Sequence, residues 1–596
     1  MADPQLVLCG DVRMAHAPRE WRDLKHAHAL AIGDGPRDVH LEINQLSRAM
    51  SRGLSDLDAD LLEVAAYVYT IDQVLTRGGT VVVDYGARWR RHLRLVIPVR
   101  CPGVWGQPQV SAALRAALVF LTDDAEWEFA FVLARDPIPC QRYVTDLIDS
   151  PDGTEFEEVV LFSGGLDSLC GAVDEVLVGQ RPVVLVSHRS VSRIQARQDA
   201  LLAALRERLP RSEISPLHVG ATINKGRELN NEFSQRGRSF LFAAVAAVVA
   251  RLAGRRRFRF YENGVTSLHL PGSRELVGAR ASRTTHPQTL HRFGALFSAL
   301  FDGPFEVQNP YQWTTKAGML RRLRAQGHAD LCARTCSCGH VWGREERHPH
   351  CGRCSQCVDR RLTTVAAGLS DAEDPPQRYD SDVLTGERTG PELTLCERYV
   401  GSALDMEAVT DTVTFGQRYA EINDALPFTG RPAAEGARAI FELHRDHAAE
   451  VRGALHAILA ARAEDLVRQS YPAKSLLGVI VGRVERTGDA PPAHAARRWI
   501  VERSRFEVFL DRRECFLGNS NEFRVVERLT ESLGQYVSVE TLIEDVWGNA
   551  RTTRNTVQQT MSNIRRRFRD REFTGVRLDG SQAGFYRLVL GAEEKS

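Results

Sequence analysis

The stretch that decides the fold of the middle of the chain is residues 157–170, EEVVLFSGGLDSLC. Residues 159–162 are β-branched or apolar, which predicts a buried strand. Two glycines then break the strand, and apolar residues return at helical spacing. Glycine lets the backbone approach a ligand closely, and the free N–H groups of a first helical turn bind anions. The stretch therefore predicts a strand, a glycine turn and a helix that together hold a phosphate chain.

The turn itself carries a specific hexapeptide. Its members are Ser163, Gly164, Gly165, Leu166, Asp167 and Ser168. The two serines supply hydroxyl donors, and Asp167 is placed to hold Mg²⁺. Two glycines alone could form a tight turn without a ligand, and the absence of a Gly-Lys-Ser/Thr ending disfavours an ordinary P-loop hydrolase. The hexapeptide resembles the SGGxDS signature of the PP-loop ATP pyrophosphatases, which cut ATP between its α and β phosphates and leave AMP on a substrate oxygen.

The length and composition of the chain indicate the number of domains and the class of protein. A chain of 596 residues is too long for one core and predicts roughly three or four domains. Its net charge of +1 gives no overall attraction to nucleic acids or membranes, so any such binding must come from a local patch. No apolar run is long enough to span a bilayer, and the N-terminus lacks an export signal. We expect a cytoplasmic protein with no membrane partner.

Strands and helices alternate after the hexapeptide. Strands are predicted at residues 182–188, 214–219 and 258–261, and helices at 194–209 and 238–252. This order predicts an α/β fold with a parallel doubly wound sheet, whose ligands lie at the carboxyl ends of the strands. The hexapeptide follows one such end, and His188 and Asn263 come at or just after two others.

The resemblance extends beyond the hexapeptide. GRSFLFAAVAA at 237–247, ENG at 262–264, TTKAGML at 314–320 and a later cysteine cluster follow the order of QueC, the 7-cyano-7-deazaguanine synthases. The similarity covers residues 156–368. It implies that Lys316 acts with Ser163, Asp167 and Ser168 in catalysis. We expect His188, Arg238 and Asn263 to bind the nucleotide together with the hexapeptide. Each of Arg238, Asn263, Thr315 and Lys316 could also be purely structural.

Six of the twelve cysteines lie between residues 332 and 357. Such crowding in a cytoplasmic chain indicates a metal rather than disulfides. Cys351, Cys354 and Cys357 have the spacing that brings thiolates to one Zn²⁺. Cys338 fits best as the fourth ligand by alignment with the QueC pattern, with Cys336, His340, His348 and His350 as alternatives. A closed four-ligand site is structural, so we expect a zinc clamp near the substrate pocket, and a redox role is the minor alternative.

The resemblance to QueC also implies a chemistry. The expected substrate is 7-carboxy-7-deazaguanine, adenylated by ATP with Mg²⁺ and then converted to an amide. QueC uses ammonia and makes a nitrile with a second ATP. This chain is longer at both ends, and it resembles components of the antiphage Qat and type IV CBASS systems, which implies an N-terminal amine of a partner protein as the acceptor. A housekeeping nitrile synthase and a non-catalytic nucleotide sensor that regulates transcription are the alternatives.

The regions outside residues 151–370 carry less chemistry. Residues 1–150 predict an α+β domain with a helix at 61–76 and strands at 80–85, 92–99 and 125–135, serving as a scaffold or a docking surface. Residues 371–392 are rich in Asp, Pro and Gly and predict a linker. Residues 393–490 consist largely of helix formers, and we interpret them as a helical spacer.

The last region, residues 491–596, resembles the winged helix of OmpR/PhoB-type response regulators. It predicts a hairpin, three helices and two strands. In the third helix Val557, Met561, Ile564 and Phe568 share one face, which predicts a core. Arg554, Arg565 and Arg569 lie on other faces and could reach DNA as a recognition helix does. Residues 551–571 hold seven arginines and one acid, so this patch is basic, although the same fold also serves protein contacts.

Overall fold

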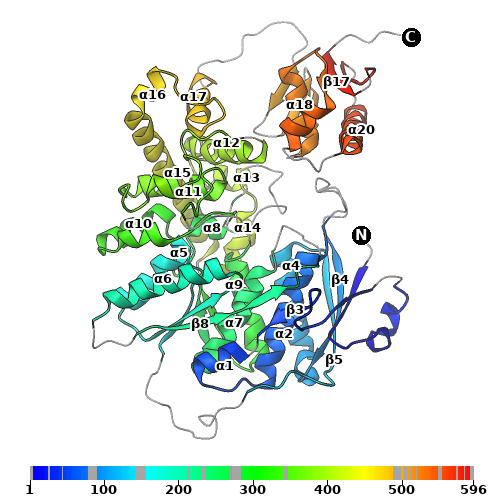
Figure 1. The fold of residues 1–596 in the computed structure, drawn as a ribbon, viewed down its shortest axis with the longest axis vertical. Helices are drawn as coiled ribbons and strands as arrows, with labels where there is room; N and C mark the ends of the chain where they lie inside the picture. The colour runs from blue at the N-terminus through cyan, green and yellow to red at the C-terminus, as the bar shows by residue number, and fades with distance from the viewer. Residues whose placement is uncertain are drawn as a thin grey trace.

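The structure is a computed structural model of the chain (Figure 1). It describes residues 4–24, 27–42, 44–77, 90–141, 156–210, 215–229, 236–268, 270, 283–340, 347–388, 390–486, 499–502, 506–510, 513–518, 520–547, 553–571, 573, 575–582 and 584–590.

The N-terminal region contains a four-stranded parallel sheet in the order β2-β1-β4-β5. Its strands are β1 (Pro4–Cys9), β2 (Ala27–Leu30), β4 (His92–Val99) and β5 (Glu126–Leu133). Two helices, α2 (Asp56–Val74) and α4 (Pro108–Thr122), lie in the crossovers between strands. Parallel strands need such crossovers, so the expected α+β class is wrong and the region is α/β. The strand expected at 80–85 lies outside the described residues.

The central sheet has five parallel strands in the order β11-β10-β6-β7-β8. These are β6 (Glu158–Leu161), β7 (Val183–His188), β8 (Leu217–Ala221), β10 (Arg257–Arg259) and β11 (Glu306–Gln308). The chain moves outward from β6 to β8 and then returns to β10 on the other side of β6. In parallel sheets, the crevice at such a reversal is where ligands bind.

Helices cover both faces of this sheet. Alternate residues of β6 and β7 face opposite sides, as the pleat requires. Val160, Val183 and Leu185 pack with α5 (Leu166–Val173) and α6 (Ser192–Arg208). Val159, Val184 and Val186 pack with α7 (Arg238–Leu252) and α9 (Pro287–Leu300). Figure 1 shows α6 and α7 on opposite sides of β8.

The N-terminal region and the central sheet share one core. A single cluster of buried apolar residues extends from Val7 to Phe305, and α2 packs against α7. In addition β3 (Val39–Leu41) pairs antiparallel with β9 (Ile223–Lys225), just beyond the end of β8. Residues before position 150 therefore form a wall of the central part of the molecule.

The segments after the central sheet also pack closely. The helices α12 (Gly390–Asp405) and α15 (Ala433–Ala461) contact α11 (Ser355–Ala366), and α15 also contacts α10 (Lys316–Ala325). Tyr379, Val383 and Leu384, from the expected linker, are buried in the same core as the cysteine cluster. This part of the chain is thus built onto the central region and does not act as a spacer.

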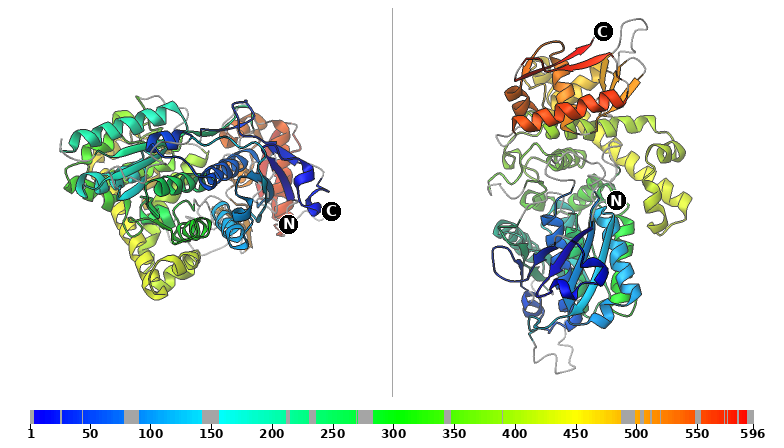
Figure 2. Two further views of the ribbon diagram at one scale, coloured as in Figure 1. Left: turned by 90° about the horizontal axis from the view of Figure 1, so that it is seen from below. Right: turned by 90° about the vertical axis from the view of Figure 1, so that its right-hand side faces the viewer.

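The C-terminal region forms a separate lobe with its own core (Figure 2). A three-stranded antiparallel sheet precedes α18 (Asn521–Glu531), α19 (Val539–Leu542) and α20 (Arg554–Asp570). The sheet strands are β12 (Trp499–Glu502), β13 (Glu507–Leu510) and β14 (Arg513–Phe516). The hairpin β16 (Val576–Asp579) and β17 (Phe585–Leu590) follows α20, and β17 also pairs with β15 (Val537–Ser538). Within the described residues, no helix has the length and apolar character needed to cross a membrane.

Candidate functional site

The hexapeptide forms a compact loop between β6 and α5. Gly164 has a φ of +80°, a conformation that favours glycine, and Gly165 caps the start of α5. The Ser163 Oγ accepts a hydrogen bond from the Gly165 N–H at 3.2 Å and lies 3.0 Å from the Ser168 Oγ. The Ser168 hydroxyl also contacts the Gly165 carbonyl at 3.0 Å. The two serines, predicted to face a ligand, therefore also brace the turn.

Asp167 links the loop to the end of β10. One carboxylate oxygen accepts hydrogen bonds from the backbone N–H and the side-chain amide of Asn263, at 3.0 and 2.7 Å. The Lys316 Nζ lies 3.7 Å from the other oxygen. Gly264 makes this meeting possible, because a Cβ there would lie 2.0 Å from the Gln312 carbonyl. Three of the predicted site residues, Asp167, Asn263 and Lys316, thus meet at the reversal point of the sheet.

Lys316 is buried at the first position of α10. Its ammonium lies 2.5 Å from the Asp359 carboxylate, and Asp359 in turn accepts a hydrogen bond from the Tyr399 hydroxyl at 2.8 Å. Burial alone would lower the pKa of Lys316, but the carboxylates of Asp167 and Asp359 raise it overall. The side chain is therefore a fixed positive charge beside the loop.

Helix α15 contributes to the same area. The Thr315 hydroxyl, which caps α10 by accepting from the Gly318 N–H at 3.0 Å, donates to Glu450 of α15 at 2.9 Å. Glu450 also forms an ion pair with Arg321. Sequence reasoning missed Asp359, Tyr399 and Glu450, since they come from segments without a recognisable motif.

Glu262 is a further residue that was not assigned a role. It follows β10 at the same sheet edge, and its carboxylate accepts a hydrogen bond from the Thr285 hydroxyl at 2.9 Å. Burial, together with the charge of Asp167, raises its pKa to about 7. The position of Glu262 directly before Asn263, at the end of a predicted strand, was the feature of the sequence that could have indicated such a role. A carboxyl group that changes charge near neutral pH beside other candidate site residues is typical of a functional site.

The side chains of His188 and Arg238 contact residues other than Asp167, Asn263 and Lys316. His188 is partly buried at the end of β7, donates its Nε2–H to the Ile223 carbonyl at 2.7 Å and contacts the rings of Tyr69 and Phe242. Burial lowers its pKa to about 4, so the ring is neutral. Arg238 is exposed at the start of α7, with its guanidinium 5.8 Å from the centre of the Phe242 ring. The Gln198 amide donates to the carbonyls of Ser163 and His188 at 3.3 Å each, so the His188 backbone lies beside the hexapeptide.

Arg238 is nevertheless held in place by the N-terminal region. The Gly237 N–H donates to Asp72 of α2 at 2.6 Å. Asp72 belongs to a network of fully buried charges, in which Arg77 and Arg91 bind both Asp72 and Asp124. The start of α7 is thus fixed by an ion network that the sequence did not indicate.

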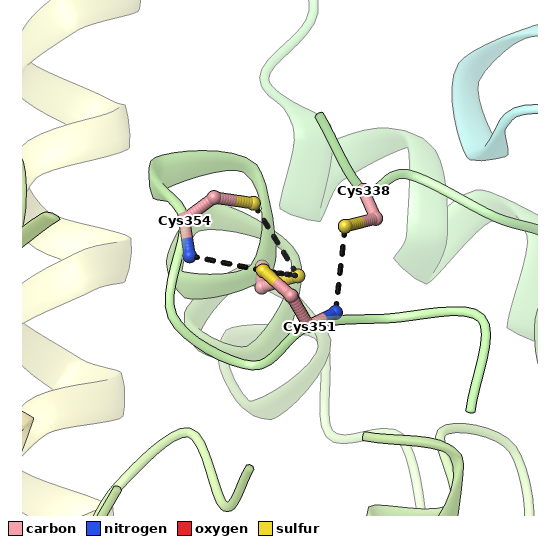
Figure 3. A group of neighbouring side chains, drawn as sticks. Cys338, Cys351 and Cys354 are labelled. Atoms are coloured by element: carbon pink, nitrogen blue, oxygen red, sulfur yellow. Dashed lines mark hydrogen bonds between the residues drawn. The ribbon is translucent and has the colours of Figure 1, made fainter. Parts of the chain in front are cut away.

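The cysteine cluster forms a four-sulfur site. The Sγ atoms of Cys338, Cys351, Cys354 and Cys357 all lie within 4.8 Å of one another, and all four side chains are buried. Figure 3 labels three of them, Cys338, Cys351 and Cys354. Backbone N–H groups donate to the sulfurs of Cys338 and Cys351 at 3.3–3.4 Å. Such bonds stabilise thiolates, the form that binds Zn²⁺. The residues present therefore fit a closed zinc site.

Cys338 is the candidate for the fourth ligand that lies with the other three sulfurs. Cys338 completes the group, whereas the Cys336 thiol donates to the Pro349 carbonyl at 3.4 Å. His350 stacks against Tyr379 with ring centres 4.8 Å apart. Among the described residues, Cys338 is the candidate whose sulfur lies within 4.8 Å of the other three, and the His340 side chain interacts with Cys351 at the edge of this group.

The third helix of the C-terminal lobe is amphipathic as predicted. Val557, Met561, Ile564 and Phe568 of α20 are buried in the core of the lobe. Two of the three arginines expected to reach DNA are already engaged: Arg554 pairs with Glu540 at 2.5 Å, and Arg565 donates to the Leu578 carbonyl at 3.0 and 3.2 Å. Arg569 is exposed.

The C-terminal lobe matches a known family of domains. Residues 514–587 match the family model described as "Transcriptional regulatory protein, C terminal". The predicted OmpR/PhoB-type winged helix is therefore confirmed, and the chain carries a regulatory domain of the kind that binds DNA. Comparison with curated proteins and with solved structures gave no match.

Proposed function

We propose that the central region is an ATP-dependent adenylating enzyme of the QueC type, which activates 7-carboxy-7-deazaguanine. The observation that carries this proposal is the cluster of Asp167, Asn263 and Lys316 around a glycine loop at the reversal point of a parallel sheet. The four-cysteine site beside α11 supports it, because it completes the set of motifs in the order of that family.

The proposed first step is adenylation. A carboxylate oxygen of the substrate attacks the α-phosphorus of ATP, the bond from that phosphorus to the bridging oxygen breaks, and pyrophosphate leaves with the electron pair. Mg²⁺ held by Asp167 would neutralise charge on the phosphates. The Lys316 ammonium, fixed between Asp167 and Asp359, adds a positive charge that needs no reorganisation in the transition state.

The proposed second step forms a C–N bond. An amine nitrogen attacks the carboxyl carbon of the acyl adenylate, the bond to the AMP oxygen breaks, and the amine proton is lost to solvent. We propose that the amine is the N-terminus of a partner protein in an antiphage system. The additional N-terminal and C-terminal regions support a macromolecular acceptor, since a small-molecule nitrile synthase has no need of them.

Two measurements test this function on the full chain. Pyrophosphate release is followed with ATP and Mg²⁺, with and without 7-carboxy-7-deazaguanine, and the expected result is release that depends on the acid. Mass spectrometry of proteins encoded beside this chain is expected to show a gain in mass that corresponds to the deazaguanine acyl group. A nitrile product with no modified protein would favour the housekeeping alternative, and no acid-dependent release would refute the enzyme.

A second candidate function rests on the winged helix. The family match of residues 514–587 favours a DNA-binding regulator, in which the central region senses a nucleotide. Nucleotide binding without turnover, together with a change in DNA affinity when the nucleotide is added, would support this function over the enzyme.

A further inference from the structure

Two arginines beside the glycine loop have no acidic partner. Arg197 lies on α6, and Arg378 ends the 3₁₀ helix Pro376–Arg378. Among the residues that the structure describes, none forms an ion pair with either, and the Arg378 Nε is buried without a hydrogen-bond partner. The nearby Arg360 and Arg361 differ, since both pair with Asp374. Unpaired cations at partly buried positions are costly unless an anion joins them.

A buried histidine stands beside these arginines. His350 is 1% exposed, and neither ring nitrogen has a hydrogen-bond partner in the described part of the structure. Its backbone pairs with the Arg378 segment, through the His350 N–H to the Arg378 carbonyl at 3.3 Å. Burial, together with the positive charges of Arg360 and Arg197, lowers the pKa of Arg378. The charges of Arg197 and Arg360 therefore act on the Arg378 guanidinium.

Both sides of this group adjoin the hexapeptide. Gln198, next to Arg197, donates its side-chain amide to the Ser163 carbonyl at 3.3 Å. On the other side, the Cys336 N–H donates to the Gly164 carbonyl at 3.4 Å, and the Cys336 thiol donates to the carbonyl of Pro349, the neighbour of His350. The helix that carries Arg197 therefore contacts the loop directly, and the segment that carries His350 contacts it through Cys336.

We infer that Arg197, Arg378 and His350 form a second anion site that holds the terminal phosphates of the nucleotide and then the pyrophosphate leaving group. This inference rests on the proposed function for the identity of the anion. Two guanidinium groups and an imidazole N–H supply donors for several phosphate oxygens. Pyrophosphate carries several negative charges, and these would supply the counterions that Arg197 and Arg378 lack.

Direct binding to the full chain tests the inference without the deazaguanine acid. Isothermal titration calorimetry with inorganic pyrophosphate and Mg²⁺ is compared with titration of AMP, which lacks the terminal phosphates. The double variant Arg197→Gln/Arg378→Gln is expected to bind pyrophosphate at least 30-fold more weakly and AMP within about twofold of the wild type, because only pyrophosphate uses the second site. Arg353→Gln, an exposed arginine near the cysteine cluster, is the matched control and is expected to leave both affinities unchanged.

Three results would overturn the site: no pyrophosphate binding by the wild type, unchanged binding by the double variant, or an equal loss of pyrophosphate and AMP affinity. An equal loss of both affinities would mean that the two arginines support the fold. The thermal midpoint and the zinc content of each variant are measured to detect such a loss of fold. The double variant Arg197→Lys/Arg378→Lys keeps both charges and is expected to bind better than the Gln double variant. Failure of acid-dependent turnover alone would refute the substrate and leave the anion site standing.

Discussion

Asp167 is a residue whose charge can be separated from its hydrogen bonds. In Asp167→Asn the side-chain oxygen can still accept from the Asn263 amide, while the negative charge beside Lys316 is lost. We expect pyrophosphate release to fall by about 10²–10³-fold, because a group that positions charge in the transition state is removed. The thermal midpoint is expected to stay close to that of the wild type. Activity within a few-fold of the wild type would contradict the role of Asp167 as a metal ligand.

Cys338 and Cys336 offer a matched pair of substitutions two positions apart. Cys338→Ser is expected to lower the zinc content of the purified chain well below one ion per molecule, since it removes one of four converging sulfurs. Cys336→Ser is expected to keep a full equivalent, because that thiol bonds to the Pro349 carbonyl instead. Elemental analysis by mass spectrometry gives both values. Equal zinc retention by the two variants would show that the ligand set is different.

At the scale of single residues, the sequence predicted the residues of the candidate site that lie within a recognisable motif. The glycine loop and Asn263 were expected at one sheet edge, the family resemblance implied that Lys316 acts with the loop, and the three meet at that edge. Asp359, Tyr399 and Glu450 could not be predicted, because long-range packing of α11, α12 and α15 brings them to the site. His188 was expected at the nucleotide because it ends a neighbouring strand; its ring bonds to the Ile223 carbonyl, and the nucleotide role stays a prediction.

Among the elements, helix α7 depends on the buried network around Asp72. Asp72→Asn is expected to lower the free energy of unfolding by about 3–5 kcal/mol, because Arg77 and Arg91 lose a buried counterion. Asp405→Asn removes an exposed partner of Arg418 and is expected to cost about 1 kcal/mol or less. Urea unfolding followed by fluorescence compares the two variants. A similar loss in both would contradict the importance of the buried network.

The same network predicts how stability depends on pH. Burial opposes the charged form of Asp124, but Arg91 and Arg77 hold its pKa at about 2, and the pKa of Asp72 is also lowered. A carboxyl group whose pKa is depressed in the folded state stabilises the fold above its unfolded pKa of about 4. This contribution is expected to vanish as the pH falls from about 4 to about 2. The difference in urea midpoint between wild type and Asp124→Asn should therefore shrink over that range, and a constant difference would contradict it.

The predicted elements were most accurate where the apolar pattern was long. Residues 238–252 and 92–99 match α7 and β4 at both ends. Strand β11 was missed, because Glu306–Gln308 is short and mostly polar. The N-terminal class was wrong because strand spacing does not reveal whether neighbouring strands run parallel. That direction is set by the packing of α2 and α4 across the crossovers.

For the whole molecule, the arrangement of the regions was the least predictable feature. The segment expected to be a linker is partly buried against the cysteine cluster, and helix α12 contacts both the central region and the C-terminal lobe. On α12, Arg398 stacks over Phe506 of the lobe at 4.5 Å, and the neighbouring Tyr399 bonds to Asp359. The apolar face of an amphipathic helix indicates that the helix packs against another element, but it does not identify that element. The contacts of α12 with the central region and the C-terminal lobe could therefore not be predicted from the sequence.

The winged helix allows a final prediction on the intact chain. Arg569 is exposed on α20, whereas Arg565 bonds to the Leu578 carbonyl and helps to hold the β16–β17 hairpin. Arg569→Glu is therefore expected to weaken binding to duplex DNA by about tenfold or more at low salt and to leave the fold intact, because it reverses a charge that can contact phosphate. Fluorescence anisotropy with a labelled duplex at several salt concentrations measures this effect, and Arg462→Glu, distant in sequence on the helical region, is the control.

Since each phosphate contact releases a counterion, the slope of log affinity against log salt should also be shallower by about one for Arg569→Glu. Binding that is insensitive to salt, or equal losses in the two variants, would indicate that this lobe contacts a protein partner instead of DNA.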